Sequence, residues 1–230
     1  MAIDDWLLDE VVDGRSGPVL RLYRWARPTL SLGWHQRSLE PHWCSLGAQR
    51  GIDLVRRPSG GRAVLHAGCL TYALLWPDPP AGERSSLYQQ ACGWLRAAFA
   101  ELGLPLRFGT AAVSHQRSSC FATSTAADLV HADGAKRIGS AQLWRRGQLL
   151  QHGSLMLEPP GDLWQEVFGQ APPDLPPLPV ELEALESLLR RAAADHLAGG
   201  PLVERPLAEA EWALIEARRG RYRVAGPSLP

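Results

Sequence analysis

The sequence has no excess charge of either sign and no long apolar run. Its 230 residues carry 24 basic and 24 acidic side chains, and this balance argues against a protein that binds nucleic acid or a membrane surface through its overall charge. No stretch approaches the roughly 18 consecutive apolar residues of a membrane span, so we expect no transmembrane helix. Acidic residues follow Met1 where a signal peptide needs basic ones, so no secretory leader is expected.

Cysteine is scarce and widely spaced. The four cysteines lie at positions 44, 69, 92 and 120. No two of them form a Cys-x-x-Cys pair, and their spacing matches no zinc-binding pattern. We therefore expect no metal site. Free thiols in a reducing compartment are the simplest account, which predicts a cytoplasmic protein. Three of the cysteines (44, 69 and 92) are predicted to be small core residues, and Cys69 is the best alternative nucleophile because it follows Gly68.

Apolar periodicity and turn residues predict a mixture of helices and strands. Helices are predicted at 4–12, 39–49, 86–102, 162–168, 180–197 and 207–219. Strands are predicted at 18–24, 29–32, 52–56, 63–66, 70–76, 128–131, 136–145 and 148–157. Ser86 stands three residues before Gln89, the spacing of a capping box, so a helix should begin there. Asp133-Gly134 predicts a tight hairpin within the last three strands.

The central stretch, residues 55–76, contains two arginines followed by a glycine-rich turn. Adjacent glycines let the backbone bend and let a ligand approach its N–H groups closely. Paired arginines such as Arg56 and Arg57 can hold a phosphate, a carboxylate or a carbonyl oxygen. On spacing alone, a hairpin corner with solvated arginines explains the same pattern.

Two other regions are candidates for a ligand site. Residues 109–125 are small and polar, and a loop of this length inside a compact domain is often functional. Gly139 and Gly153 interrupt neighbouring strands, which indicates either a ligand-facing sheet surface or a pair of bulges.

Several motifs resemble the lipoate–protein ligase and octanoyltransferase superfamily. The run Arg56–His66 (Arg-Arg-Pro-Ser-Gly-Gly-Arg-Ala-Val-Leu-His) is similar to its Arg-Arg-x-Ser/Thr-Gly-Gly-x-Ala-Val-x-His signature. The run Ala135–Gln142 resembles its lysine motif, and Gln151–Leu155 resembles its closing strand. The opening helix (Asp4-Asp5-x-Leu-Leu) and the stretch Tyr23–Gln36 also resemble the family.

The resemblance covers roughly residues 1–160 and implies an α+β fold. In this superfamily a mixed, mainly antiparallel sheet is flanked by helices, as in the catalytic domains of class II aminoacyl-tRNA synthetases and biotin ligases, and holds an acyl chain beside a lysine. We divide the chain into a catalytic domain (1–170), a proline-rich connector (171–179) and C-terminal helices packed on the domain (180–230).

The resemblance implies acyl transfer through a cysteine thioester. Cys120 lies 16 residues before Lys136, where the resembled octanoyltransferases place their nucleophile, and Arg62 stands where ligases more often carry a third glycine. Such enzymes take octanoyl from acyl carrier protein and pass it to a lysine of a lipoyl domain, in lipoate biosynthesis and protein lipoylation. No cofactor is implied for this reaction.

The predicted catalytic residues are Cys120, as nucleophile, and Lys136, as its electrostatic and proton-transfer partner. An adjacent ammonium group favours the thiolate and lowers the pKa of a thiol. The predicted substrate contacts are Arg56, Arg57, Ser59, Gly60, Gly61, Arg62, Ala63, His66, Gly139, Ser140, Ala141, Gln142, His152, Gly153 and Ser154. Structural roles stay open: Lys136 as a solvated strand residue, the histidines as core residues, and the arginines as partners of acids.

The expected donor is acyl carrier protein, and the expected acceptors are lipoyl domains of glycine-cleavage H protein or of 2-oxoacid dehydrogenase acyltransferases. No nucleic acid or membrane partner is expected. Three alternatives stay open: an ATP-dependent lipoate ligase that uses ATP and Mg²⁺, a lipoyl amidotransferase that acts between two lipoyl domains, and a non-catalytic protein that binds lipoyl domains.

Overall fold

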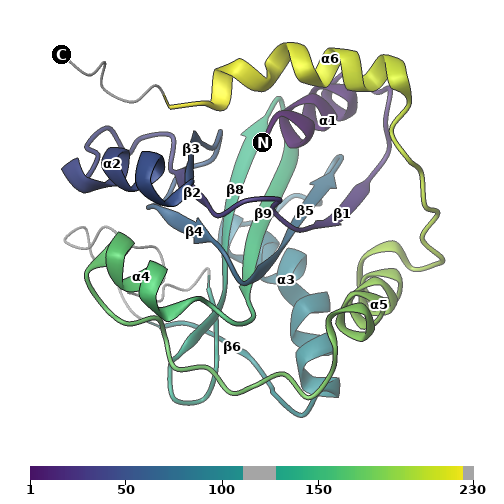
Figure 1. Cartoon of the computed structure of the whole chain (residues 1–230). Coiled ribbons are helices and arrows are strands. Elements are labelled where there is room, and N and C mark those ends of the chain that lie inside the picture. The colour runs from purple at the N-terminus through teal and green to yellow at the C-terminus, as the bar shows by residue number, and fades with distance from the viewer. Residues whose placement is uncertain (111–127, 225–230) are drawn as a thin grey trace.

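Two β-sheets form the centre of the computed structural model, which describes residues 1–110 and 128–224 (Figure 1). The larger sheet is antiparallel and has six strands in the order β1-β5-β9-β8-β7-β6; the smaller has the order β3-β2-β4. The strands of the larger sheet are Val19–Tyr23 (β1), Cys69–Trp76 (β5), Gln148–Met156 (β9), Lys136–Arg145 (β8), Leu129–Val130 (β7) and Arg107–Phe108 (β6). Those of the smaller sheet are Asp53–Arg56 (β3), Thr29–Leu32 (β2) and Val64–His66 (β4).

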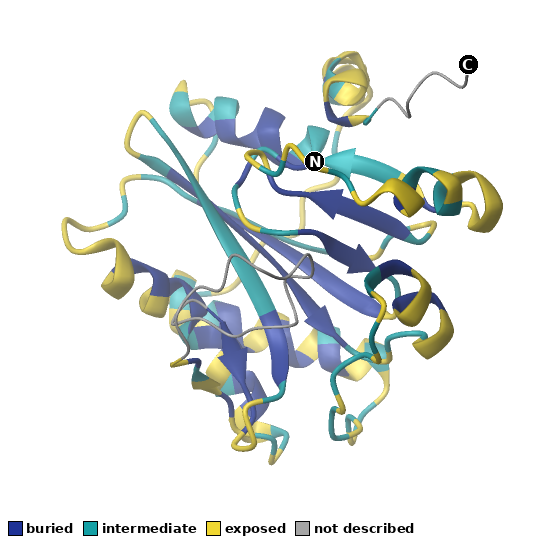
Figure 2. Ribbon diagram, turned by 90° about the vertical axis from the view of Figure 1, so that its left-hand side faces the viewer, coloured by how far each residue is buried: buried dark blue, intermediate teal, exposed yellow. Residues whose placement is uncertain are grey.

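Helices cover both faces of the larger sheet. The α-helices of the described residues are Ala2–Val12 (α1), Pro41–Arg50 (α2), Arg84–Glu101 (α3), Gly161–Phe168 (α4), Leu182–Ala193 (α5) and Glu209–Arg219 (α6). Successive side chains of a strand point to opposite faces. Tyr72 and Leu74 of β5 pack with α3 and α5, whereas Ala73 and Leu75 pack with α1 on the other face. This double covering explains why β5 is an almost continuous apolar run, with dark-blue central strands in Figure 2.

The smaller sheet has its own apolar core. Leu30, Leu32 and Leu65 pack against Trp43 of α2 and Trp164 of α4. Strands β2 and β3 run parallel, because the chain crosses through α2 between them, whereas β2 and β4 run antiparallel. This sheet carries the ends of β3 and β4, and so it positions the glycine-rich turn between them.

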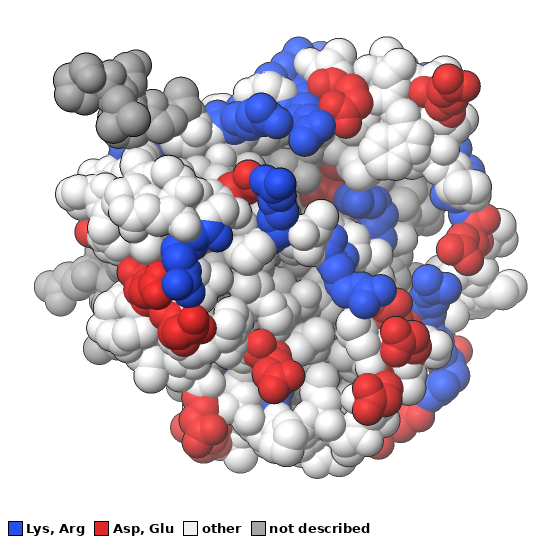
Figure 3. Space-filling model, viewed as in Figure 1, with Lys and Arg blue, Asp and Glu red and all other residues white. Residues whose placement is uncertain are grey.

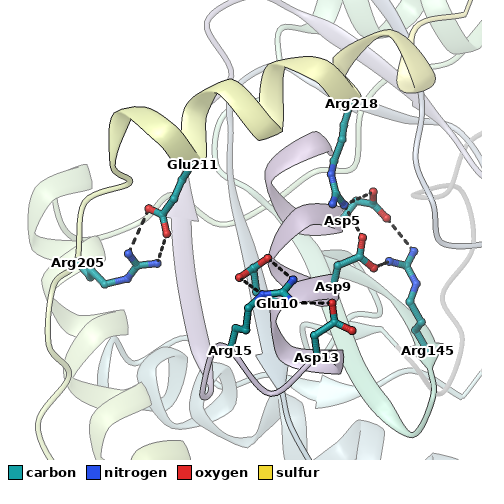
Figure 4. Close-up of polar contacts among 9 residues, drawn as sticks. All are labelled: Asp5, Asp9, Glu10, Asp13, Arg15, Arg145, Arg205, Glu211 and Arg218. Atoms are coloured by element: carbon teal, nitrogen blue, oxygen red, sulfur yellow. Dashed lines mark hydrogen bonds and ion pairs between the residues drawn. The ribbon is translucent and has the colours of Figure 1, made fainter.

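The C-terminal helices pack on different parts of the body. Helix α5 lies against α3, and α6 lies across α1 (Figure 1). Two acids of α1, Asp5 and Asp9, meet Arg145 of β8 and Arg218 of α6 (Figure 4). The Arg145 Nη2–Asp5 Oδ1 distance is 2.8 Å, and the Arg218 Nη1–Asp9 Oδ2 distance is 2.6 Å. This acid–arginine cluster therefore joins the first helix to the last.

The proline-rich connector is tied to the larger sheet by a buried arginine. Arg137 of β8 donates from Nη1 to the Met156 carbonyl oxygen at 2.9 Å and from Nη2 to that of Pro176. Burial lowers the pKa of Arg137 to about 10. The domain boundaries predicted from the sequence remain a prediction.

The predicted α+β fold with a mainly antiparallel sheet is confirmed, with one wrong detail at a helix start. Helix α3 begins at Arg84 after Glu83, and the expected capping box at Ser86 does not form. Ser86 is already inside the helix, where its Oγ accepts a bond from Gln90 Nε2 at 3.3 Å. The sequence also gave no sign of β6, which has two residues.

The charges on the surface are mixed. On the face shown in Figure 3, basic and acidic side chains lie interspersed. None of the helices within residues 1–110 and 128–224 is long and apolar enough to cross a membrane.

Candidate active site

The paired arginines fasten the glycine-rich turn to the end of β2. Arg57 is 5% exposed; its Nη1 donates to the Ser31 carbonyl oxygen at 2.9 Å, and its Nη2 donates to that of Gly60 at 2.8 Å. Arg56 Nη1 donates to the carbonyl oxygen of Gly33 at 2.9 Å. The interpretation of both arginines as solvated is therefore wrong for Arg57. These contacts use carbonyl oxygens of the chain itself, and the substrate roles of both arginines remain predictions.

The turn and the end of β2 touch through their backbones. A Cβ atom placed on Gly33 would lie 1.8 Å from the carbonyl oxygen of Gly61, a distance that no side chain tolerates. Gly61 itself has φ +96°, a conformation that favours glycine. Two glycines are thus required for the turn to reach its place.

Gly139 and Gly153 lie on adjacent strands without a bulge. The register runs unbroken from Ile138 opposite Leu155 to the hairpin end, so the alternative of paired bulges is wrong. A Cβ atom on Gly153 would lie 2.4 Å from Tyr72 Cε1 and 2.6 Å from Ser140 Oγ. The absence of a side chain at Gly153 leaves room for the side chains of Tyr72 and Ser140, whose hydroxyl oxygens are 2.7 Å apart.

A cavity of about 50 Å³ brings the two predicted glycine-bearing stretches together. Of the predicted contacts, its wall includes Arg57, Gly61, His66, Gly139, Ser140, Ala141, His152, Gly153 and Ser154. Its wall does not include Arg56, Ser59, Gly60, Arg62, Ala63 or Gln142.

The cavity wall also holds residues that sequence reasoning missed. These are Met1, Tyr23, Ser31, Val64 and Thr71. For Thr71 a signal existed, because it is a polar residue within an otherwise apolar strand. No local pattern indicates that Met1 lines the cavity, because its position depends on how α1 lies against the sheet.

His152 belongs to a buried polar chain that starts in α1. Its Nε2 lies 2.5 Å from Ser59 Oγ, and its Nδ1 lies 3.8 Å from Asp4 Oδ2. Burial lowers the pKa of His152, although Asp4 opposes this effect. Burial alone would raise the pKa of the Asp4 carboxyl, but the amino terminus, Arg21 and His152 outweigh it and hold that pKa well below its usual range. His152 is thus both a satisfied buried residue and part of the cavity wall.

Lys136 is buried with an acidic partner. Its Nζ lies 2.8 Å from Asp128 Oδ1, and both side chains are at most 5% exposed. The interpretation of Lys136 as a solvated strand residue is therefore wrong. The backbone N–H of Gly109 donates to the carbonyl oxygen of Asp128 at 2.9 Å, which fixes the chain on both sides of residues 111–127. The predicted nucleophile, Cys120, lies outside the described residues.

The other cysteines differ in their surroundings. Cys92 is a core residue as predicted, and burial raises the pKa of its thiol to about 12. Cys44 is only half-buried, so its assignment to the core is wrong. Cys69 is buried, and its Sγ lies 3.9 Å from His66 Nδ1.

Comparison with known proteins decides the family. The family described as the lipoyl protein ligase A/B catalytic domain matches residues 1–175. The chain belongs to this family. The resemblance found in the motifs of the sequence is thereby confirmed.

Curated relatives in the lipoyl protein ligase A/B family carry the name octanoyltransferase LipM. That of Carboxydothermus hydrogenoformans is 37% identical over 162 residues, covering 69% of this chain and 60% of the relative. That of Moorella thermoacetica is 37% identical over 170 residues, covering 70% and 62%. The matched part of the chain thus spans about three fifths of the length of these relatives.

Solved structures of lipoate–protein ligases share the fold. A putative lipoate protein ligase from T. acidophilum, Ta0514, has a TM-score of 0.74 at 21% identity, covering 95% of this chain and 89% of that one. A lipoate-protein ligase A bound with ATP has a TM-score of 0.73 at 20% identity, with the same coverage. At these identities the likeness shows the fold of the lipoyl protein ligase A/B family and no more.

Proposed function

We propose that this chain is an octanoyltransferase that moves an octanoyl group from acyl carrier protein to a lysine of a lipoyl domain. The observation that carries the proposal is the buried Lys136, within a region 37% identical to a protein named octanoyltransferase. The proposed partners are acyl carrier protein as donor and lipoyl domains as acceptors, and the proposed compartment is the cytoplasm. No cofactor is needed, because the thioester donor is already activated.

Two transfers make up the proposed reaction. The Cys120 sulfur bonds to the carbonyl carbon of the donor thioester, and the carrier leaves as its thiol. The amine of the acceptor lysine then attacks the new thioester, which forms the amide and releases the Cys120 thiolate. Splitting a difficult transfer into two easier steps is the general advantage of covalent catalysis.

Lys136 has two tasks in this scheme. Its ammonium group favours the Cys120 thiolate, which is the reactive form of the thiol, and gives a proton to the departing carrier thiolate. Once neutral, its amine takes the proton that the acceptor lysine gives up. Asp128, at 2.8 Å, balances the buried ammonium charge, which would otherwise be costly to remove from water.

The acyl chain should be selected by its length. Each buried methylene stabilises binding by about 0.8 kcal/mol, so chains two carbons shorter should bind roughly tenfold more weakly. The cavity between Gly153 and the glycine-rich turn is proposed to hold the reacting end of the acyl group, because polar side chains from both sheets line it.

Intact mass after mixing the protein with octanoyl-acyl carrier protein, without ATP, tests the proposal. Wild type should gain an octanoyl group on Cys120 and lose it to an added lipoyl domain, and Cys120→Ala should octanoylate no lipoyl domain. Lys136→Met should slow the loading by roughly 10²–10⁴-fold, the usual contribution of a proton-transfer group.

Other outcomes identify the alternatives. Lipoyl-domain modification that requires ATP and survives Cys120→Ser would indicate a lipoate ligase. Loading only from an acylated lipoyl domain would indicate an amidotransferase. Tight lipoyl-domain binding with no turnover from any donor would indicate a non-catalytic binding protein.

A further inference from the structure

Cys69 and His66 form a thiol–imidazole pair beside the cavity. The Cys69 sulfur lies 3.9 Å from His66 Nδ1. On the far side of the ring, Nε2 lies 2.8 Å from Ser31 Oγ, and the ring stacks on Trp25 with 4.3 Å between centroids. These two contacts hold the imidazole so that Nδ1 faces the sulfur.

The surroundings keep the imidazole neutral. Burial lowers the pKa of His66 well below its usual value, and the charged or titratable groups that act on it, Arg57, His152 and the amino terminus, lower it further. Arg57 also donates to Ser31 Oγ at 3.3 Å. In the tautomer that carries its proton on Nε2 and donates it to the Ser31 oxygen, the ring presents the lone pair of Nδ1 to the Cys69 thiol.

The thiol has polar neighbours of its own. Burial raises the pKa of Cys69, and the hydroxyls of Ser154 and Thr71 work in the opposite direction. The buried Ser154 hydroxyl, which acts on the Cys69 thiol, also lines the cavity together with His66.

Cys69 and His66 both line a larger groove. This groove, about 910 Å³, runs between the β1–β2 connection, the β4–β5 turn and the proline-rich connector, and its size is typical of ligand sites. Its apolar wall includes Trp25, Leu157, Leu178 and Leu182. His66 lines the groove and the cavity alike, so its ring lies between the two spaces, and Cys69 lines the groove.

Backbone contacts hold Gly68, the residue before Cys69, in place. The N–H groups of Leu157 and Glu158 both donate to the Gly68 carbonyl oxygen, at 2.9 and 3.0 Å. A Cβ atom on Gly68 would lie 1.9 Å from the Glu158 carbonyl oxygen. The backbone thus fixes the sulfur against His66 and the groove.

We propose that Cys69 is a second acyl-accepting thiol, with His66 as its base, which takes an apolar acyl group from a thioester in the groove. The Cys69 sulfur bonds to the thioester carbonyl carbon, and the bond from that carbon to the donor sulfur breaks. His66 takes the Cys69 proton and passes it to the departing thiolate. The choice of octanoyl as the acyl group rests on the proposed function.

A small thioester, octanoyl-N-acetylcysteamine, tests the site without needing recognition of a carrier protein. Peptide mapping of the Cys120→Ala variant should locate the octanoyl group on Cys69. Adding Cys69→Ala should abolish that adduct, whereas adding Cys44→Ser, at a half-buried thiol far from His66 in the sequence, should leave it unchanged. No adduct, or an adduct only on Cys44 or Cys92, overturns the proposal.

The role of His66 has its own readout. With His66 as base, the acylation rate at Cys69 should change little between pH 6 and 8. His66→Gln should lower this rate at least tenfold and make it rise with pH, as expected for a thiol that must ionise unaided. An unchanged rate and profile in folded His66→Gln would remove His66 from the reaction. Should that variant fail to fold, the mapping of Cys69 still decides the proposal.

The two proposals fail in different ways. Octanoylation of a lipoyl domain by wild type, measured in parallel with octanoyl-acyl carrier protein, reports on the proposed function. An adduct on Cys69 without that transfer would refute the octanoyltransferase assignment alone. Transfer without any adduct on Cys69 would refute the second thiol alone.

Discussion

At the scale of single residues, glycines determine how closely the walls of the cavity approach. Gly33 receives the backbone of Gly61, and Gly153 receives the side chains of Tyr72 and Ser140. These positions differ from the other glycines of helices and turns, around many of which a Cβ atom would find open space. Replacing a glycine with alanine, which adds one methyl group, tests whether the position has room for a side chain.

Gly153→Ala should destabilise the protein by about 1–3 kcal/mol, the usual cost of overpacking a buried site. The added methyl group would lie 2.4 Å from Tyr72 Cε1, so the ring must move and its bond to Ser140 must lengthen. Gly93→Ala in α3 is the matched control, because its Cβ meets nothing within 4 Å and alanine favours a helix. Urea denaturation compares the two; equal stability of Gly153→Ala and wild type would contradict the expected clash.

At the scale of elements, the acid–arginine cluster decides where α6 lies. Arg218 is the contribution of α6 to the cluster, and it contacts both Asp5 and Asp9 of α1. Ile215, also on α6, is buried with the apolar residues of α1. Charge and apolar contact thus act on the same face of the helix.

Arg218→Met should loosen α6 while keeping the length of the side chain. It leaves two carboxylates with Arg145 as their shared partner, and we expect a loss of about 1–3 kcal/mol, between the values for exposed and buried pairs. Arg219→Met, whose partner Glu216 is more than half exposed, should change stability by less than about 0.5 kcal/mol. Hydrogen exchange of α6 amides should increase in the first variant only; equal exchange in both would argue against the cluster.

Local patterns predicted the elements well, because apolar spacing is a property of neighbouring residues. The strand run at 70–76 and the helix over 86–102 were found in this way, with ends shifted by one or two residues in β5 and α3. The start of α3 was predicted wrongly because a capping-box spacing also occurs inside helices. The separation into two sheets had no local signal, since β2 pairs with β3 and β4 across intervening chain.

Local patterns also predicted only that part of the site whose residues lie close together in the sequence. The glycine-bearing motifs named much of the cavity wall, but the chain from Asp4 through His152 to Ser59 joins three distant segments. Aspartates are mostly exposed in proteins, whereas Asp4 and Asp5 of α1 are buried. Only the position of α1 against the sheet reveals their partners.

At the scale of the whole molecule, buried carboxyl and imidazole groups make the stability fall at acidic pH. Despite burial, the amino terminus, Arg21 and His152 lower the pKa of Asp4, and Arg145, Tyr222 and Arg218 lower that of Asp5; burial lowers the pKa values of His66 and His152. In each case the unfolded chain binds protons at a higher pH than the folded one. Stability should therefore fall as the pH drops below about 6.5, where unfolded histidines titrate, and further below about 4, where unfolded aspartates titrate.

Asp4→Asn should flatten the acid part of this profile. The variant loses the ionisable group whose pKa is depressed, but it also leaves Arg21 without its buried partner, which costs about 3 kcal/mol at neutral pH. Asp13→Asn, at an exposed pair with Arg15, should keep the wild-type profile. Denaturation midpoints at pH 3.5, 5 and 7 give the comparison, and an unaltered acid slope in Asp4→Asn would assign it to other carboxyls.

Protein synthesis presents the partners of α1 at very different times. Asp5 and Asp9 leave the ribosome first, Arg145 follows with β8, and Arg218 emerges 73 residues later. At roughly 5–20 residues per second, the nascent chain spends roughly 4–15 s with one of the two guanidinium groups missing. Helix α1 therefore gains its last arginine partner only after α6 has emerged, and until then part of its apolar face stays uncovered.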